Sequence, residues 1–187
     1  MKKCLVITLV FAGFIFADNI LVNGDFELDL TTGWVESSAG AYDTITRGTI
    51  YEPDPDYEAY VFKGYGSGFA RLAQVIDAPS TDLDFSIKAK IYAYDNNADT
   101  LCWAASAVII SYLNDLGMLL GDTRICMLTS PCTWQNTPTC HLIPVPDSFW
   151  HNYSFNIDDE LTNLPGVNPL DIGKIEIALY DTTAHTC

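Results

Sequence analysis

The feature of this sequence that most constrains its fold is a series of short runs rich in Val, Ile, Tyr, Phe and Thr, separated by clusters of Gly, Pro, Asn and Asp. Such runs are typical of β-strands, and the clusters between them are typical of turns. No long segment carries a helical period. We expect strands at residues 20–22, 42–50, 59–62, 70–76, 83–94, 103–113, 118–125, 151–157 and 174–180.

This succession of strands without intervening helices predicts an all-β sandwich or barrel with antiparallel sheets, and it excludes βαβ units. The sequence contains no internal repeat and no linker, so we expect a single domain. The residues expected in its core are Phe26, Trp34, Leu72, Phe85, Ile87, Ile91, Ile109, Phe155, Ile175 and Ile177.

The first seventeen residues have the pattern of a secretory signal peptide. Lys2 and Lys3 precede an apolar run at 4–16, and Ala17 is a small residue suited to the cleavage site. The apolar run is short for a membrane span, although a retained N-terminal anchor is an alternative. We therefore expect residues 18–187 to be secreted or at the cell surface, without insertion into a membrane.

The charge of the chain restricts its partners. Removal of Lys2 and Lys3 from the 9 basic residues leaves 7 against 24 acidic residues, a net charge of −17. Such a charge argues against binding to nucleic acid or to anionic membranes. It suits an extracellular surface, and it often accompanies bound calcium.

Five cysteines remain after residue 17, and in an exported chain they indicate disulfides. We expect Cys132 to pair with Cys140 across a loop rich in Thr and Pro, and Cys102 to pair with Cys126 across a hairpin. This pairing leaves Cys187 over. The alternative is a zinc site formed by Cys126, Cys132, Cys140 and His141, although no CxxC motif supports it.

The segment 85–94 has two different faces. Side chains alternate along a strand, so Phe85, Ile87, Ala89, Ile91 and Ala93 would face the core. The other face would carry Lys88, Lys90, Tyr92 and Tyr94. Aromatic rings stack on sugars while polar neighbours bind hydroxyls, so this face is the candidate ligand-binding site.

The stretch Asn19-Ile20-Leu21-Val22-Asn23-Gly24-Asp25-Phe26-Glu27, followed by Gly33-Trp34, resembles the opening of the galactose-binding-domain-like jelly-roll superfamily. Segments 69–76, 150–155 and 174–179 resemble later strands of the same superfamily, which includes carbohydrate-binding modules of secreted glycoside hydrolases. The resemblance implies a two-sheet antiparallel jelly-roll β-sandwich that binds a glycan or polysaccharide. It also implies that Glu27 is a ligand of a structural calcium.

The C-terminal residues depart from this superfamily, whose domains end in a strand that reads roughly Y-[IV]-D-[ND]-V. Residues 181–187 do not match that strand. We therefore expect the domain to lack its last strand and to adjoin other domains of a longer chain. The same departure puts the implied calcium site in doubt.

The sequence offers no catalytic constellation. Its three histidines are not accompanied by a serine in a nucleophile-elbow context, and dense acidic loops are more often solvated than catalytic. The expected function is thus a secreted, non-catalytic carbohydrate-binding module for attachment or substrate targeting. The alternative is a structural or adhesive β-sandwich module of a larger cell-surface protein, without affinity for sugars.

Overall fold

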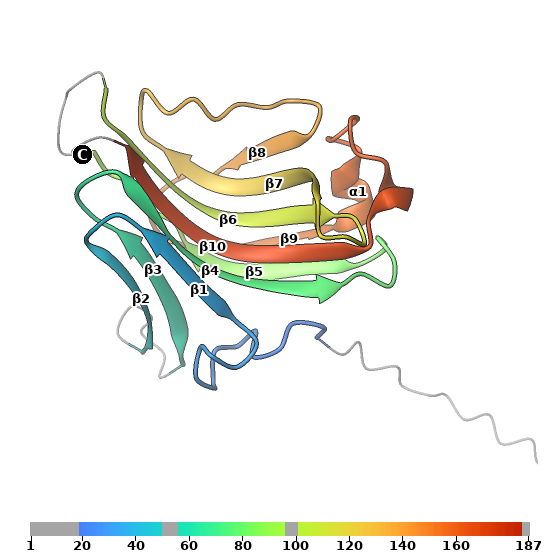
Figure 1. Cartoon of the computed structure of the whole chain (residues 1–187), viewed down its shortest axis with the longest axis horizontal. Coiled ribbons are helices and arrows are strands. Elements are labelled where there is room, and N and C mark those ends of the chain that lie inside the picture. The colour runs from blue at the N-terminus through green and yellow to red at the C-terminus, as the bar shows by residue number, and fades with distance from the viewer. Residues whose placement is uncertain (1–18, 50–55, 96–100, 185–187) are drawn as a thin grey trace, which may run out of the picture.

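One layer of the molecule is a six-stranded sheet with the order β1-β4-β10-β6-β7-β8 (Figure 1). The computed structural model describes residues 19–49, 56–95 and 101–184. The strands of this sheet are β1 (Val35–Ala39), β4 (Gly68–Asp77), β10 (Lys174–Ala184), β6 (Trp103–Leu113), β7 (Leu119–Leu128) and β8 (Cys140–Pro144). All neighbours are antiparallel except β7 and β8.

The second layer consists of two separate pairs of strands, as Figure 1 shows. One pair is β2 (Asp43–Gly48) with β3 (Glu58–Lys63), and the other is β5 (Asp84–Lys90) with β9 (Trp150–Asn156). A short helix α1 (Ile157–Leu161) and a 3₁₀ turn η1 (Pro169–Asp171) follow β9. The predicted jelly-roll β-sandwich is confirmed. No helix in the described ranges has the length and apolar character needed to cross a membrane.

The core lies between the layers, on the inner face of the six-stranded sheet. Of the expected core residues, Trp34, Leu72, Phe85, Ile91, Ile175 and Ile177 are buried, while Phe26, Ile87 and Phe155 are partly buried against them. Ile109 is an exception. Its neighbours Val108 and Ile110 face the core, so alternation along β6 directs Ile109 to the outer face of the sheet.

The N-terminal segment 20–22 is not a strand, contrary to the prediction. The amide of Gln74 instead replaces a strand partner: its Oε1 accepts from the N–H of Val22 at 2.7 Å, and its Nε2 donates to the carbonyl of Val22 at 2.8 Å. The Nε1–H of Trp34 donates to the carbonyl of Asn23 at 3.0 Å. Side chains therefore dock this segment on the sandwich.

A buried lysine orders the turns beside the sheet. The Nζ of Lys63 lies within hydrogen-bond distance of four carbonyl oxygens: Ala41 at 2.6 Å, Gly64 at 3.0 Å, Tyr65 at 3.3 Å and Gly66 at 2.8 Å. Only 3% of Lys63 is exposed. The Thr183 hydroxyl also lies within hydrogen-bond distance of the Gly64 and Gly66 carbonyls, at 3.3 and 2.5 Å. Because the site is shielded from water, the ammonium and this hydroxyl together supply the donors that the carbonyls need.

A buried carboxylate joins the two layers at the same place. On the central strand β10, Asp181 Oδ2 accepts from the backbone N–H of Lys63 at 2.7 Å. The hydroxyl oxygen of Ser106 lies 2.7 Å from both Asp181 Oδ1 and the carbonyl oxygen of Tyr92. A hydroxyl has one hydrogen and can donate to only one of the two. Both contacts become hydrogen bonds when Asp181 is protonated and donates to Ser106.

We predict that Lys63→Met destabilises the protein by about 3 to 5 kcal/mol, the typical cost of removing one partner from a buried charged network. Methionine keeps the apolar stem but leaves the four carbonyls and Asp181 without the ammonium. Urea denaturation measures the effect. Lys174→Met is the control, because Lys174 lies on the surface 4.0 Å from Asp77. Equal stabilities of the two variants would contradict a structural role for the contacts between the Lys63 ammonium and the four carbonyls.

We predict that Asp181→Asn removes a pH dependence of stability. Burial raises the pKa of Asp181 to about 6 from its ordinary 3.8. The folded state therefore binds the proton more tightly than the unfolded state, and this contribution to stability is lost as the pH rises from 4 through 6. The loss is on the order of 3 kcal/mol for two pH units.

Denaturation across this pH range tests the prediction. The stability of the wild type minus that of Asp181→Asn should fall as the pH rises, whereas exposed Asp77 provides a control variant, Asp77→Asn, without this effect. Parallel pH profiles for the wild type and Asp181→Asn would contradict the raised pKa.

Candidate functional site

The candidate site is the outer face of β5 and of the segment that follows it. Ala89, Ile91 and Ala93 are buried, while Lys88, Lys90, Tyr92 and Tyr94 are exposed, as the alternation predicts. Tyr92 is 55% exposed and Tyr94 is 60% exposed. Their ring centroids are 6.1 Å apart, and the ring planes differ by 11°. The structure thus brings two parallel, solvent-accessible rings together.

The neighbouring strand β9 widens this face. Asn152 lies opposite Lys88, and Trp150 lies opposite Lys90 in the antiparallel register. The Nζ of Lys88 is 5.7 Å from the centroid of the Trp150 ring. The outward-facing residues at this end of β5 and β9 are therefore cationic, amide and aromatic. The sequence analysis identified the lysines and tyrosines but missed Trp150 and Asn152. The alternation of side chains along one strand does not reveal which other strand pairs with it.

The core fixes the position of the two rings. Ile91 and Ala93 are buried on either side of Tyr92, and the carbonyl of Tyr92 contacts the Ser106 hydroxyl, which in turn contacts Asp181. The backbone that presents the tyrosines is thus attached to the central strand. A fixed backbone lowers the entropy lost when a ligand binds.

A second aromatic surface lies on the outer face of the six-stranded sheet, and the sequence analysis missed it. Trp134, from the connection 129–139 between β7 and β8, stacks over the Arg124 guanidinium at 4.3 Å and packs 6.1 Å from Tyr180. Tyr180 in turn lies 5.8 Å from Phe69. Ala107 pairs with Tyr180 on one side and with Cys126 on the other. Its small side chain leaves room for the aromatic rings that cover the sheet here. Alternation along β4 and β10 would have placed Phe69 and Tyr180 on this face.

The carboxylates on this second surface are engaged by arginines. Arg124 donates through Nε and Nη2 to Asp122 at 2.9 and 2.7 Å, and Arg71 forms an ion pair with Glu176. Trp134 is half-covered by the groups that it stacks on. On this surface Asp122 and Glu176 therefore already have arginine partners.

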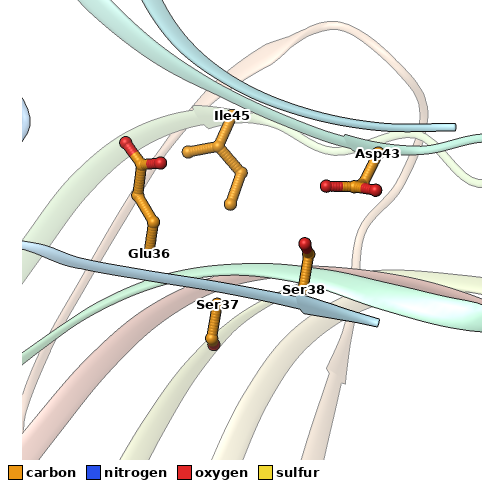
Figure 2. A pocket seen from close by; sticks show the side chains of 5 residues that line it. All are labelled: Glu36, Ser37, Ser38, Asp43 and Ile45. Atoms are coloured by element: carbon orange, nitrogen blue, oxygen red, sulfur yellow. The ribbon is translucent and has the colours of Figure 1, made fainter. Parts of the chain in front are cut away.

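A small opening between β1 and β2 is lined by Glu36, Ser37, Ser38, Asp43 and Ile45 (Figure 2). Figure 2 shows Glu36 and Ser38 on the side of β1 that faces Ile45 and Asp43, with Ser37 on the other side. Only one lining residue is apolar, so the opening has no flat surface on which a sugar ring could stack. The face of β5 remains the better candidate.

The two predicted disulfides are absent, because Cys126, Cys132 and Cys140 are free thiols. Cys140 lies opposite Asp122, near the start of β7, whereas Cys132 lies in a turn after Thr129. Asp122 and Thr129 are about 23 Å apart along the strand at the usual rise of about 3.3 Å per residue.

The hairpin register also separates the other predicted pair. Cys126 lies opposite Ala107, five residues beyond Cys102, so the two sulfurs are too far apart for a bond. Burial raises the pKa of Cys126 and of Cys140 to about 11, which keeps both thiols protonated at neutral pH. Cys187 lies outside the described residues.

Glu27 is exposed in the N-terminal turn. The carbonyl oxygens of Phe26 and Glu27 accept hydrogen bonds from the Arg47 guanidinium, at 2.5 Å from Nε and 2.8 Å from Nη2. Arg47 itself stacks on Tyr57 at 3.6 Å. The backbone carbonyls of Glu27 and of the residue before it thus already bind a cationic side chain. The calcium at Glu27 stays a prediction, and the signal peptide lies outside the described residues.

No group of three or more His, Cys, Asp or Glu residues in the described ranges is arranged to hold a metal ion. The alternative zinc site fails for a geometric reason. His141 and Cys140 are neighbours on β8 and therefore point to opposite faces of the sheet. His141 Nδ1 lies 2.5 Å from Oε1 of the buried Glu160, which also accepts from the Thr123 hydroxyl at 2.8 Å.

Comparison with known proteins bears on the fold. No family model and no curated protein sequence matches the chain. Among solved structures, the enzymatically active domain of tailspike protein 4 from bacteriophage CBA120 matches 90% of this chain with a TM-score of 0.51 and 14% identity. This chain spans 20% of the length of that protein. The match supports the sandwich fold alone.

A family 11 carbohydrate-binding module from Clostridium thermocellum, solved in complex with a mixed-linked β-1,3-1,4 tetrasaccharide, matches 86% of this chain and 89% of its own. Its TM-score is 0.36 at 14% identity, which is too low to support a functional comparison.

Proposed function

We propose that this protein is a secreted, non-catalytic glycan-binding module whose ligand lies on the outer face of β5 and of residues 91–94, which follow it. The observation that supports the proposal is the pair of exposed, parallel rings of Tyr92 and Tyr94, flanked by Lys88 and Lys90. Exposed aromatic pairs without an apolar partner indicate a recognition surface.

The chemistry of this face suits sugars. The C–H faces of a sugar ring are apolar and stack on aromatic rings, while its hydroxyls need hydrogen-bond partners. The lysine ammonium groups donate hydrogen bonds, and the amide of Asn152 both donates and accepts. Each ring contributes about 1 kcal/mol by analogy with aromatic pairs, so the expected dissociation constant lies between roughly millimolar and micromolar.

A binding role without catalysis is part of the proposal. Glycosidases use two carboxyl groups on either side of the scissile bond. On β5 and β9 the outward-facing residues contain one carboxylate in the described chain, Asp84, and Asn156 Nδ2 donates to it at 3.2 Å. Attachment of a larger protein to a polysaccharide, or targeting of its substrate, is the role that fits a face of this kind.

We predict that Tyr92→Ala and Tyr94→Ala each weaken binding of the recognised glycan about fivefold, because each loses about 1 kcal/mol of stacking. The double variant should bind about 25-fold more weakly. Calorimetry against the glycan selected from an array provides the measurement.

Tyr57→Ala is the matched control for the tyrosine variants. Tyr57 directly precedes β3, is partly exposed and stacks on Arg47. It should bind the glycan like the wild type. Unchanged binding by the double variant Tyr92→Ala/Tyr94→Ala would remove the β5 face as the site.

The second candidate function is a structural or adhesive module without affinity for sugars. A cluster of exposed apolar residues at the β6–β7 turn and η1 favours it: Leu116 is 82% exposed, Met118 57%, Leu119 60% and Leu170 92%. Leu116 and Leu170 line the same opening. Exposed apolar patches mark protein contacts.

If this second function holds, the wild type binds no glycan on the array. Sedimentation should then detect a self-association that Leu116→Ser/Leu170→Ser abolishes. Glycan binding that is lost with Tyr92→Ala/Tyr94→Ala and kept in the leucine variant would instead favour the glycan-binding module.

A further inference from the structure

Exposed aromatic rings lie on both strand pairs of the second layer, not on β5 alone. Beside β2 and β3 they are Tyr42, Phe62 and Tyr65, all of which are exposed. Alternation along β3 directs Phe62 outward, because its neighbour Val61 packs against the core. Much of the surface of these rings stays in water, so the hydrophobic gain of folding does not account for their positions.

The three rings form one surface. Tyr42 and Tyr65 meet edge to face, with ring centroids 6.2 Å apart and ring planes at 74°. Gly64 lies between Tyr42 and Phe62: a Cβ atom added to it would lie 3.2 Å from both Phe62 Cε1 and Tyr42 Cβ. Thr44 lies opposite Phe62 on β2 and is exposed on the same face. The surface therefore combines apolar ring faces with hydroxyl groups.

The backbone of Tyr42 is strained. Its φ of 61° lies in the left-handed region, where a bulky side chain is rare and costs stability. The Tyr42 carbonyl accepts from the N–H of Gly64 at 2.7 Å, and the Lys63 ammonium contacts the carbonyls of Ala41 and Tyr65. The ring of Tyr42 is 69% exposed, so its burial does not offset the strain. A conformation that costs stability and presents a ring to solvent points to recognition.

This surface adjoins the β5 face across the boundary between the two strand pairs. The Ser106 hydroxyl oxygen is 2.7 Å from both the Tyr92 carbonyl oxygen and Asp181 Oδ1. Asp181 Oδ2 is 2.7 Å from the backbone nitrogen of Lys63. The backbones of Tyr92 and Lys63 are therefore within about 10 Å of each other. Phe62, which precedes Lys63, and Tyr92 are both exposed on the outer side of the second layer.

We propose that Tyr42, Phe62 and Tyr65 extend the β5 face across this boundary, and that the extended surface binds the interior of an uncharged polysaccharide chain. This inference rests on the proposed glycan-binding function. Such a chain presents apolar C–H faces to the rings on both sides, while its hydroxyls exchange hydrogen bonds with the tyrosine and Thr44 hydroxyls. Contact of one chain with two linked surfaces raises the affinity above that of either surface alone.

The charge around the new surface disfavours an acidic chain. Asp43 directly follows Tyr42 and is exposed, and exposed Glu36 lines the same opening as Asp43. The whole chain has a net charge of −15, so a polyanion is repelled over most of the surface. An uncharged polymer meets no such barrier.

Two steps test the inference. Affinity electrophoresis against galactan, mannan, xylan and hydroxyethylcellulose identifies an uncharged polysaccharide that the wild type binds, with polygalacturonate as the acidic comparison. Calorimetry then uses the trisaccharide and the hexasaccharide from a partial hydrolysate of that polymer. We expect the wild type to bind the hexasaccharide about tenfold more tightly, because only the longer chain contacts both surfaces. Phe62→Ala/Tyr65→Ala should bind both lengths about equally. The control Tyr57→Ala should keep the preference for the longer chain, because Tyr57 lies at the other end of β3.

Tyr42→Gly separates recognition from stability. Glycine adopts a positive φ without strain, so the urea midpoint should change little. The affinity for the hexasaccharide should fall about fivefold, because one stacking ring is lost. A lower urea midpoint with unchanged affinity would assign the ring to the fold and overturn the inference.

The remaining outcomes distinguish this inference from the proposed function. The inference is overturned if Phe62→Ala/Tyr65→Ala keeps the wild-type preference for the hexasaccharide. Binding that Tyr92→Ala/Tyr94→Ala weakens and Phe62→Ala/Tyr65→Ala leaves unchanged would confine the ligand to the β5 face and keep the proposed function. Binding to polygalacturonate but to none of the uncharged polymers would have the same meaning. Failure to bind any polysaccharide would remove both.

Discussion

The two layers of this sandwich are held in register by one buried carboxylate. Asp181 lies on the central strand of the large sheet and accepts from the backbone of Lys63 in one half of the opposite layer. Through Ser106 it also contacts the backbone of Tyr92 in the other half. Apolar packing determines which side chains face the core, but it does not fix how far one strand is shifted along another. These directional hydrogen bonds fix both. The split second layer and the placement of the candidate site both depend on this junction.

The same region shows how the chain distributes its charges. The Lys63 ammonium and the Arg47 guanidinium occupy clusters of backbone carbonyls, a role that bound cations have in many loops. Turn geometry is thus fixed by charges that are covalently part of the chain.

The sequence predicted best where local pattern alone decides the structure. Residues 103–113 form β6 as expected, and the alternation in 85–94 correctly separated the buried residues from Lys88, Lys90, Tyr92 and Tyr94. Segments whose structure depends on distant partners were missed. The strand β8 exists because β7 lies beside it in parallel, and the polar strand β1 is held by β4.

The prediction of a Cys132–Cys140 disulfide failed for the same reason. That pairing assumed that the connection 129–139 is a short local loop, but it runs the length of β7 to reach a parallel partner. Trp134 covers the outer face of the sheet along the way. No property of residues 132–140 alone indicates this path.

The place of β10 in the sheet has a consequence for how the protein is made. It is the last described strand to be synthesised, yet it lies between β4 and β6, and 118 residues separate Lys63 from its partner Asp181. Until β10 emerges, the pair β1–β4 and the group β6–β7–β8 each present an unpaired strand edge, the kind that associates with other chains. The sheet cannot close progressively from its N-terminus. A chain that ends before β10 therefore has two parts of the sheet and no strand to join them.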